Sequence, residues 1–453
     1  MHADTIWQLA SRRERFARRG LEGQLDARRL RQGGVDVQCF AVWMPPATKD
    51  PYVRAHHLID RFEREVIAPP NGIELVRSSK DIERLTAERK VSAMLTLEGA
   101  LALRGDPKRL DVFHERGVRM ASLTWNPSNP FGDGAQGQKH GGATKAGLAL
   151  VERMNDLQII VDVSHASSET FWDVALHSAR PIVATHSNAA AIMAHARNLD
   201  DLQLLAIARA GGVVGLNFHA PFLRPSGDAT IEDVVAHARH IKAVAGARSL
   251  ALGSDFDGNI QAPIGLGDVS QLPALTQALE RAGFTARELQ GVLGGNFLRV
   301  VRQTEQAKPQ RTISWRPAST QPSQDGDPTA RFALDGSTLT AWKPPSQSQR
   351  LTLQAQGPGL THVAVVASGP ARPSGVTRLK ITAKGPSGAS WEGELGVAGQ
   401  VAWDEMVLPG LEDEPSLMIE IEVVGYDKAL GALEIAEVTV GRKKGGHEGA
   451  QPP

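Results

Sequence analysis

Apolar and polar positions alternate regularly through residues 33–295. Short apolar runs rich in β-branched residues are separated by longer polar stretches with helical spacing, such as 144–157 and 231–245. This alternation is typical of βα units whose strands form a parallel sheet. Seven strands are expected, over Val35–Trp43, Val91–Leu97, Val118–Thr124, Ile159–Val163, Pro181–Thr185, Gly212–Phe218 and Ser249–Gly253. An eighth strand, ending near Met1, would complete a (β/α)8 barrel of the α/β class over residues 1–305.

The pattern changes after Val301. Residues 306–330 are rich in Pro, Ser and Thr, which predicts a linker or domain edge. From 331 to 442, short alternating runs punctuated by Gly and Pro predict an all-β sandwich. The last residues, 443–453, are expected to form a disordered tail. The chain is therefore predicted to hold a barrel domain followed by a smaller sandwich domain.

Composition narrows the function without deciding it. Lys+Arg and Asp+Glu number 50 each in 453 residues, so no net charge favours nucleic acid or an acidic membrane surface. The one cysteine, Cys39, excludes intrachain disulfides and Cys-rich zinc sites. There is no transmembrane run of 18 apolar residues, and no phosphate-binding loop, GxSxG elbow or HExxH helix. A hydrolase built on carboxylates and imidazoles stays compatible with all of these features.

Side chains that can bind metal follow the predicted strands directly. Glu98, His165, His186, Asp255 and Asp257 each come just after an apolar run, and His2 and Asp4 stand where the eighth strand would end. In a parallel barrel these strand ends meet on one face, where the active site lies. Imidazole nitrogens and carboxylate oxygens are good zinc ligands. Singly, each residue could be a loop or helix-capping residue, but together they predict a metal site in the barrel mouth.

The motifs around these residues resemble the membrane (renal) dipeptidase family, the M19 peptidases, over roughly residues 1–302. The residues that carry the resemblance are His2-Ala-Asp4-Thr5, Thr96-Leu-Glu98-Gly99, Asp162-Val-Ser164-His165, Thr185-His186-Ser187, Ala196-Arg197-Asn198 and Gly253-Ser-Asp255-Phe-Asp257-Gly258. The resemblance implies a binuclear zinc metallopeptidase that cleaves dipeptides with a hydroxide bridging two zinc ions.

The resemblance also assigns roles to residues. One zinc would be bound by His2 and Asp4 and the other by His165 and His186, with Glu98 bridging both. Asp255 would orient the attacking water and take its proton, and Arg197 would hold the substrate carboxylate. An arginine fork matches a carboxylate with two hydrogen bonds, which favours small substrates with a free C-terminus.

The segment Leu123-Thr124-Trp125-Asn126 departs from part of the family. Some members carry a His, thought to steady the oxyanion, at the position of Trp125. Trp125 and Asn126 are therefore expected to line the substrate site here, and the oxyanion would depend more on zinc.

The chain starts later than the family motif, which has an Asp two residues before the first His. The first strand is therefore expected to be truncated, with Met1 an internal methionine and any signal peptide upstream of it. Localisation then leans towards the cell envelope or outside, and otherwise towards the cytoplasm. His2 and Asp4 would lie on a chain end that can fray, so the first zinc site is expected to be the less secure one.

The C-terminal domain resembles, more faintly, a galactose-binding-like (discoidin-type) sandwich. The run Ala333-Leu-Asp335-Gly336-Ser-Thr-Leu-Thr-Ala-Trp342 carries this resemblance. It implies a carbohydrate or cell-envelope ligand, against the simpler interpretation of a structural appendage.

Two other functions stay open from the sequence. The same site could serve an amidohydrolase that acts on N-acyl amino acids or lactams. Alternatively, the barrel could be non-catalytic and the sandwich the binding part. The preferred dipeptide, tolerance of L or D residues and the oligomeric state, with a homodimer as one candidate, are not specified by the sequence.

Overall fold

The structure is a computed structural model that describes residues 1–12, 15–17, 23–67, 71–306, 315–317, 320–322, 350–356, 360–366, 376–396, 403–411, 416–426 and 437–443. The chain divides into two compact units. The first comprises Met1–Leu199 and Ala206–Thr312, and the second Asp200–Leu205 and Ile313–Pro453. No helix among the described residues is both long and apolar enough to cross a bilayer.

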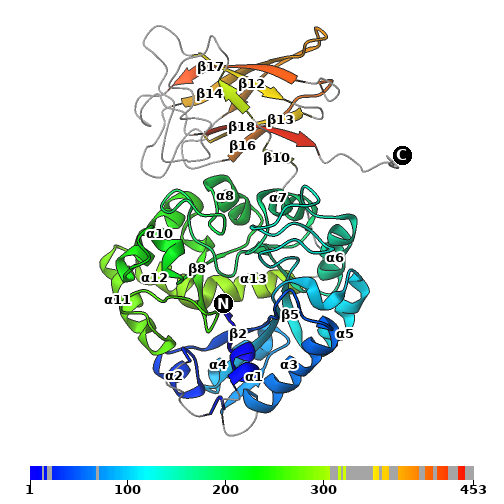
Figure 1. Cartoon of the computed structure of the whole chain (residues 1–453). Helices are drawn as coiled ribbons and strands as arrows, with labels where there is room; N and C mark the ends of the chain where they lie inside the picture. The colour runs from blue at the N-terminus through cyan, green and yellow to red at the C-terminus, as the bar shows by residue number, and fades with distance from the viewer. Residues whose placement is uncertain are drawn as a thin grey trace. The chain divides into compact units, whose positions relative to one another are not determined.

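The first unit is a parallel α/β barrel, as predicted (Figure 1). Its strands are β1 (His2–Ala3), β2 (Val37–Val42), β4 (Val91–Leu97), β5 (Val118–Ser122), β6 (Ile160–Asp162), β7 (Ile182–Val183), β8 (Val214–Asn217) and β9 (Leu250–Phe256). Ladders join β2-β4-β5-β6-β7 and β1-β9-β8, and a bridge between Ala184 and Val214 links the two sheets. Since β1 also lies beside β2, the ring of eight strands closes.

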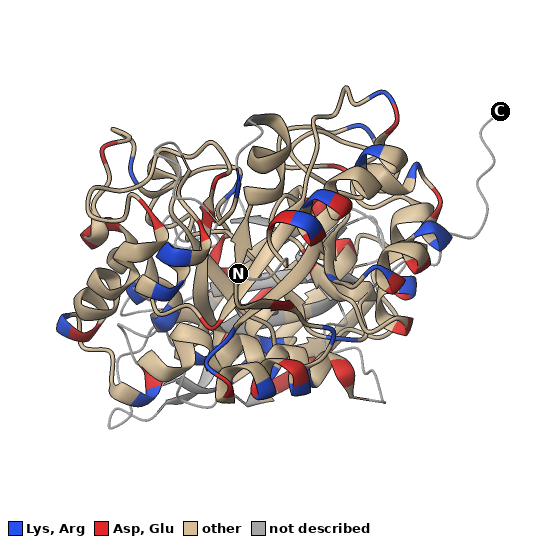
Figure 2. Ribbon diagram, turned by 90° about the horizontal axis from the view of Figure 1, so that it is seen from below, with Lys and Arg blue, Asp and Glu red and all other residues tan. Residues whose placement is uncertain are grey.

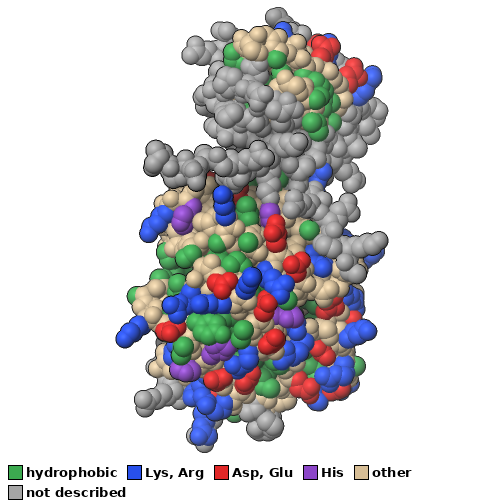
Figure 3. Space-filling view, turned by 90° about the vertical axis from the view of Figure 1, so that its right-hand side faces the viewer, with side chains coloured by type: hydrophobic (Ala, Val, Ile, Leu, Met, Phe, Trp, Pro, Cys, Tyr) green, Lys and Arg blue, Asp and Glu red, His purple; other side chains and the backbone are tan. Residues whose placement is uncertain are grey.

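Helices surround these strands, which stand together in the middle of the unit (Figures 1 and 2). The α-helices are α1 (Thr5–Arg12), α2 (Ala27–Gln32), α3 (Pro51–Glu65), α4 (Ser79–Ala87), α5 (Leu110–Glu115), α6 (Lys145–Asp156), α7 (Ser168–His177), α8 (Asp201–Arg209), α9 (Ala220–Leu223), α10 (Ile231–Ala245), α11 (Leu272–Arg281), α12 (Ala286–Gln290) and α13 (Asn296–Glu305). An additional short strand, β3 (Ile73–Leu75), pairs with β4. Basic and acidic side chains are interspersed on the face of the barrel in Figure 3, in keeping with the balanced charge of the sequence.

The barrel interior is apolar below the strand ends. One buried cluster joins residues of opposite strands, including Cys39, Met94, Val183 and Ala251. Burial raises the pKa of the Cys39 thiol to about 11, so this cysteine is a packing residue at neutral pH. This packed interior supports the polar site above it.

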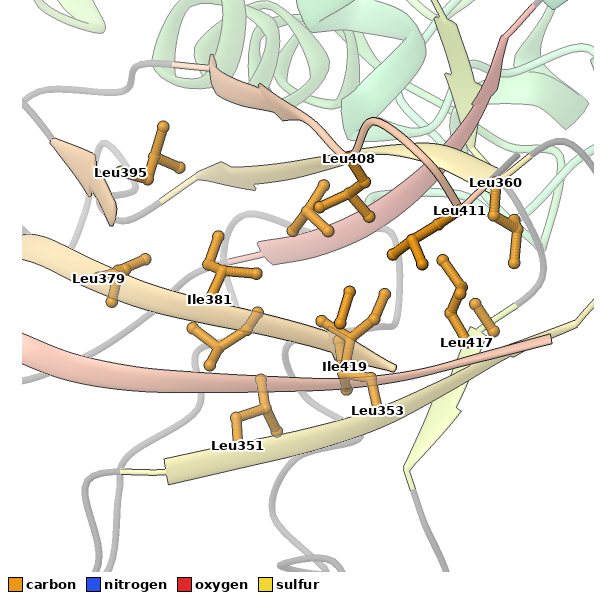
Figure 4. Close-up of a cluster of buried hydrophobic side chains, with 14 of the residues drawn as sticks. Leu351, Leu353, Leu360, Leu379, Ile381, Leu395, Leu408, Leu411, Leu417 and Ile419 are labelled. Carbon is orange, nitrogen blue, oxygen red and sulfur yellow. The ribbon is translucent and has the colours of Figure 1, made fainter. Parts of the chain in front are cut away.

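The second unit contains two antiparallel sheets. One has the order β10 (Trp315–Pro317), β18 (Glu437–Lys443), β13 (Leu360–Val366), β16 (Trp403–Val407). The other has the order β11 (Thr320–Pro322), β12 (Arg350–Gln356), β17 (Ser416–Tyr426), β14 (Val376–Lys384), β15 (Ser390–Gly396). Buried aliphatic side chains of both sheets, such as Leu353, Val363, Ile381 and Ile419, form one core (Figure 4).

Two details refine the predicted domain limits. The stretch 306–330, predicted as a linker, includes the edge strands β10 and β11. Both strands have only three residues and end in Pro317 or Pro322, and proline is tolerated at a sheet edge, so they lack a strong sequence pattern. The galactose-binding-like run 333–342 lies outside the described residues, as does the predicted tail after Lys443.

Candidate metal centre

The predicted metal ligands meet at the carboxyl ends of the barrel strands. His2 lies on β1, Glu98 directly follows β4, and Asp255 lies near the end of β9. His165 and His186 follow β6 and β7 within three residues. Asp4 is held in place because its backbone N–H donates to Phe256 O at 2.9 Å, and the side chains of both His2 and Asp4 are buried.

One carboxylate oxygen of Glu98 faces His2 and Asp4, the candidate metal ligands near the N-terminus. Glu98 Oε2 lies 3.2 Å from His2 Nε2, which in turn lies 3.6 Å from Asp4 Oδ2. Yet His2 Nε2, Glu98 Oε2 and Asp4 Oδ1 are buried atoms without any hydrogen-bond partner among the described residues. Leaving such atoms unsatisfied costs free energy, and a cation between them would satisfy them. This half of the site therefore fits a metal ion.

The other oxygen of Glu98 faces two histidines. Glu98 Oε1 lies 2.8 Å from His165 Nε2 and 3.7 Å from His186 Nε2, and the two Nε2 atoms are 2.8 Å apart. Glu98, His165 and His186 form one group whose ligand atoms are close enough to hold an ion, and His2, Asp4 and Asp255 form another. Candidate metal-ligating groups therefore lie on both sides of the Glu98 carboxylate.

The electrostatics of the site also favour bound cations. Burial, reinforced by the charge of Asp4, raises the pKa of Glu98 to about 8, and burial raises that of Asp255 to about 7. Burial lowers the pKa of His165 and His186 well below the usual range, which leaves both rings neutral. Burial also opposes the charging of His2, but Glu98 and Asp4 outweigh it and raise the pKa of His2 well above its ordinary value. Crowded buried carboxylates and neutral imidazoles are what a cationic metal stabilises.

The backbone around Asp255 is strained. Ser254, Asp255 and Asp257 have φ angles of 65°, 71° and 63°, in the left-handed region that non-glycine residues rarely occupy. A side chain at Gly258 would meet Asp255 Oδ1 at 2.6 Å and Asp4 Oδ2 at 2.8 Å, so only glycine fits this close approach. Strain of this kind is concentrated at functional sites.

A cavity of about 560 Å³ opens onto Glu98, His165 and Asp255. Three indoles form an aromatic wall, with ring centroids 5.2 Å apart between Trp7 and Trp43 and 5.2 Å apart between Trp43 and Trp125. The cavity volume matches a small-molecule site.

Arg197 contributes a positively charged side chain to the lining of this cavity. It is 2% exposed, and its Nη1 has no hydrogen-bond partner among the described residues, while Nη2 lies 3.3 Å from His186 O. Burial lowers the pKa of Arg197 to about 10, so it stays charged at neutral pH. Since Nη2 also lies 3.2 Å from His165 Nε2, Nη1 is the nitrogen that remains available, and a buried guanidinium of this kind in a cavity is suited to an anionic ligand.

The remaining predicted residues differ in what their side chains contact. Trp125 and Asn126 line the cavity, and Asn126 Oδ1 also lies 2.8 Å from His165 Nδ1. Asp257 also lines the cavity, but it accepts hydrogen bonds from Thr5 Oγ1 and Gln24 N, both at 2.6 Å, so its carboxylate mainly stabilises the fold.

Some cavity residues were missed from the sequence: Trp7, Trp43, His219 and Phe222. Trp43 follows β2, and His219 and Phe222 follow β8, so the strand-end argument that predicted the candidate ligands could have predicted these three as well.

Similarity to known proteins identifies a family. The family model of membrane dipeptidases (peptidase family M19) matches residues 1–314. Dipeptidase 3 of Rattus norvegicus is 35% identical over 294 residues, which span 63% of this chain and 59% of the rat protein.

Two solved structures extend the comparison. The dipeptidase AC, an M19 metallopeptidase, superposes with a TM-score of 0.63 at 31% identity, covering 68% of this chain and 98% of that one. A Rhodobacter sphaeroides metallopeptidase, solved with a phosphinate mimic of L-Ala-D-Ala, gives a TM-score of 0.62 at 30% identity, covering 67% and 97%.

Proposed function

The chain belongs to peptidase family M19, the membrane dipeptidases, and from that membership we propose that it hydrolyses dipeptides with two zinc ions. The observation that carries the proposal is the position of Glu98. Its two oxygens face different donor sets, at 3.2 Å from His2 and 2.8 Å from His165. His2 and Asp4 would hold one ion and His165 and His186 the other, with Glu98 shared. Nitrogen and carboxylate donors suit zinc.

Zinc, when bound, supplies Lewis acidity that polarises the scissile carbonyl and acidifies a water molecule. Asp255 is the proposed base because Oδ2 accepts a hydrogen bond from Asn217 Nδ2 at 3.0 Å, while Oδ1 lies 4.0 Å from His2 Nε2 at the cavity. It would take a proton as the water oxygen bonds to the carbonyl carbon. The C–N bond then breaks, and the proton passes to the leaving amine.

Arg197 would hold the free carboxylate of the substrate, and the indole wall would contact its side chains. Such a clamp near the scissile bond favours dipeptides over longer chains. The test is amine release from L-L and L-D dipeptides, tripeptides and N-acyl amino acids by zinc-loaded protein. Cleavage of dipeptides alone is expected. Equal cleavage of N-acyl amino acids would favour the amidohydrolase, and a protein that neither binds zinc nor cleaves any substrate would favour a binding role.

Changing Arg197 to Ala tests the clamp. The variant should lower kcat/KM by about 100-fold for dipeptides, because it removes a charged hydrogen-bonding partner in a buried site. Steady-state kinetics on each dipeptide and its carboxyl-amidated form measures this. Arg302→Ala is a matched control, since Arg302 pairs with Glu83 in an exposed ion pair. An equal loss on amidated substrates would contradict the clamp.

A further inference from the structure

Asp162 is a buried carboxylate beneath the candidate metal centre, at the end of β6. Four donors converge on it. The backbone N–H groups of Ser164 and Thr185 each donate to Oδ1 at 3.0 Å, Ser164 Oγ donates to Oδ1 at 2.6 Å, and Thr185 Oγ1 donates to Oδ2 at 2.6 Å. Asp162 lies close enough to His2 and His186 to be a candidate metal ligand. Its two oxygens are already engaged, so we assign it another role.

Thr185 connects Asp162 to a metal-binding ring. A hydroxyl has one proton to donate, and Thr185 Oγ1 directs it to Asp162 Oδ2. The same oxygen lies 2.8 Å from His186 Nδ1 and can only accept there. Nδ1 of His186 must therefore carry the proton, and Nε2 presents a lone pair towards Glu98.

His165 is oriented independently of this relay. The Asn126 side-chain oxygen, which can only accept, lies 2.8 Å from His165 Nδ1. His165 Nε2 thus also carries a lone pair, which accepts a hydrogen bond from Arg197 Nη2 at 3.2 Å and faces His186 Nε2 at 2.8 Å. Two facing lone pairs repel each other unless a cation lies between them. The two rings are therefore held as ligands before any metal arrives.

We propose that Asp162 and Thr185 are positioning residues that fix the tautomer of His186 and thereby set the affinity of the metal position shared by His165 and His186. This inference rests on the proposed function, because it assumes that these histidines bind zinc. No described hydrogen bond joins Asp162 or Thr185 to His2, Asp4 or Glu98, so the metal position of His2 and Asp4 should be less affected. Partners of this kind typically change metal affinity by about 10- to 100-fold.

Thr185→Val removes the hydroxyl at nearly constant volume, and Thr185→Ser keeps it. Zinc affinity is measured for both by titration of the full-length protein against a competing chelator. The valine variant should lose about 10- to 100-fold affinity for one of the two ions, while the serine variant stays close to wild type. Thr96→Val is a matched control, because Thr96 is buried and its hydroxyl donates to Phe40 O at 3.3 Å without reaching an imidazole.

A second measurement reads the tautomer without metal. Nitrogen NMR of ¹⁵N-histidine-labelled, metal-free protein should show His186 protonated at Nδ1 in the wild type, with this signature weakened in Thr185→Val. Suppose that the wild type binds two zinc ions and cleaves dipeptides, but Thr185→Val keeps the wild-type zinc affinity and the wild-type tautomer of His186. That result would overturn the positioning role and leave the proposed function intact. A wild type that binds no zinc would overturn the proposed function as well.

Discussion

The barrel and the sandwich bury very different side chains. In the described part of the sandwich, the buried residues are all apolar, mainly Leu, Ile, Val and Ala (Figure 4). The barrel buries acids, histidines and an arginine together at one end of its strands. Burying polar groups is unfavourable unless they are paired or bind a ligand. The accumulation in the barrel therefore marks a working site, whereas the sandwich core only stabilises its fold.

Charged side chains among the described residues of the sandwich lie on its outer surface instead. Lys380 pairs with Glu392 at 2.9 Å and Arg378 with Glu394 at 3.6 Å, across neighbouring strands. Exposed pairs of this kind contribute little to stability, because solvent screens them. The comparison thus predicts large functional effects from polar changes in the barrel and purely structural effects from apolar changes in the sandwich.

Glu98→Gln should have the largest effect. The amide removes the negative charge between the two donor sets, so zinc content and kcat/KM should both fall, the latter by at least about 10³-fold, or ~4 kcal/mol. Metal analysis and dipeptide kinetics measure the two losses. Glu88→Gln is a control, because Glu88 pairs with Arg84 and Lys90 on the surface. Wild-type turnover in Glu98→Gln would contradict the proposal that Glu98 is shared by the two zinc ions.

Ile419→Ala probes the other side of the comparison. Ile419 is 0% exposed in the sandwich core, so its truncation should cost about 3 kcal/mol of the free energy of unfolding. Chemical denaturation followed by fluorescence measures this loss, and kcat/KM at low temperature should stay at the wild-type value. Met418→Ala, at an exposed neighbour, should change stability by less than about 0.5 kcal/mol. A parallel loss of activity in Ile419→Ala would show that the sandwich supports catalysis.

Sequence patterns predicted the long, uniformly patterned elements best. The strand over Val91–Leu97 and the helix over Ile231–Ala245 were predicted at the bounds that the structure shows. The short strand β3 was missed, because three residues carry little pattern.

The site was predictable where it depends on strand ends and not where it depends on side-chain direction. His165, His186 and Glu98 follow apolar runs, so topology alone brings them together. The hydroxyl of Thr185 and the carboxylate of Asp257 have the right chemistry in sequence, but their hydrogen-bond partners decide their roles.

Asp133 is a buried acid of the barrel that belongs to none of the candidate metal-ligating groups, and it sharpens the comparison. It accepts hydrogen bonds from Lys139 N at 2.8 Å and Gly141 N at 2.8 Å, and from Ser128 Oγ at 2.7 Å. Burial alone would raise the pKa of Asp133, but these hydrogen bonds outweigh it and hold the pKa well below its usual range. Asp133→Asn should therefore destabilise the barrel by about 2 kcal/mol at pH 7.

The pH dependence of the unfolding free energy distinguishes the contribution of the Asp133 charge from that of its side-chain shape. A carboxylate whose pKa is depressed by folding contributes its stability above the unfolded pKa of about 4 and loses it as the pH falls below that value. The difference in unfolding free energy between wild type and Asp133→Asn should thus be constant from pH 5 to 7 and shrink towards pH 3. Denaturation curves at several pH values measure it, with the exposed Asp228→Asn as control. If this difference in unfolding free energy does not change with pH, the charge of Asp133 is not what stabilises the fold.

Ending the chain after Gln306 should have the smallest effect on catalysis. All proposed ligands, Asp255, Arg197 and the indole wall lie before that residue, and α13 ends at Glu305. The shortened protein should bind two zinc ions and keep kcat/KM for dipeptides within about twofold, or ~0.4 kcal/mol of the barrier. Metal analysis and kinetics of the two chain lengths test this. If the shortened protein is folded and zinc-loaded but has a much lower kcat/KM, the sandwich domain contributes to catalysis by the barrel site.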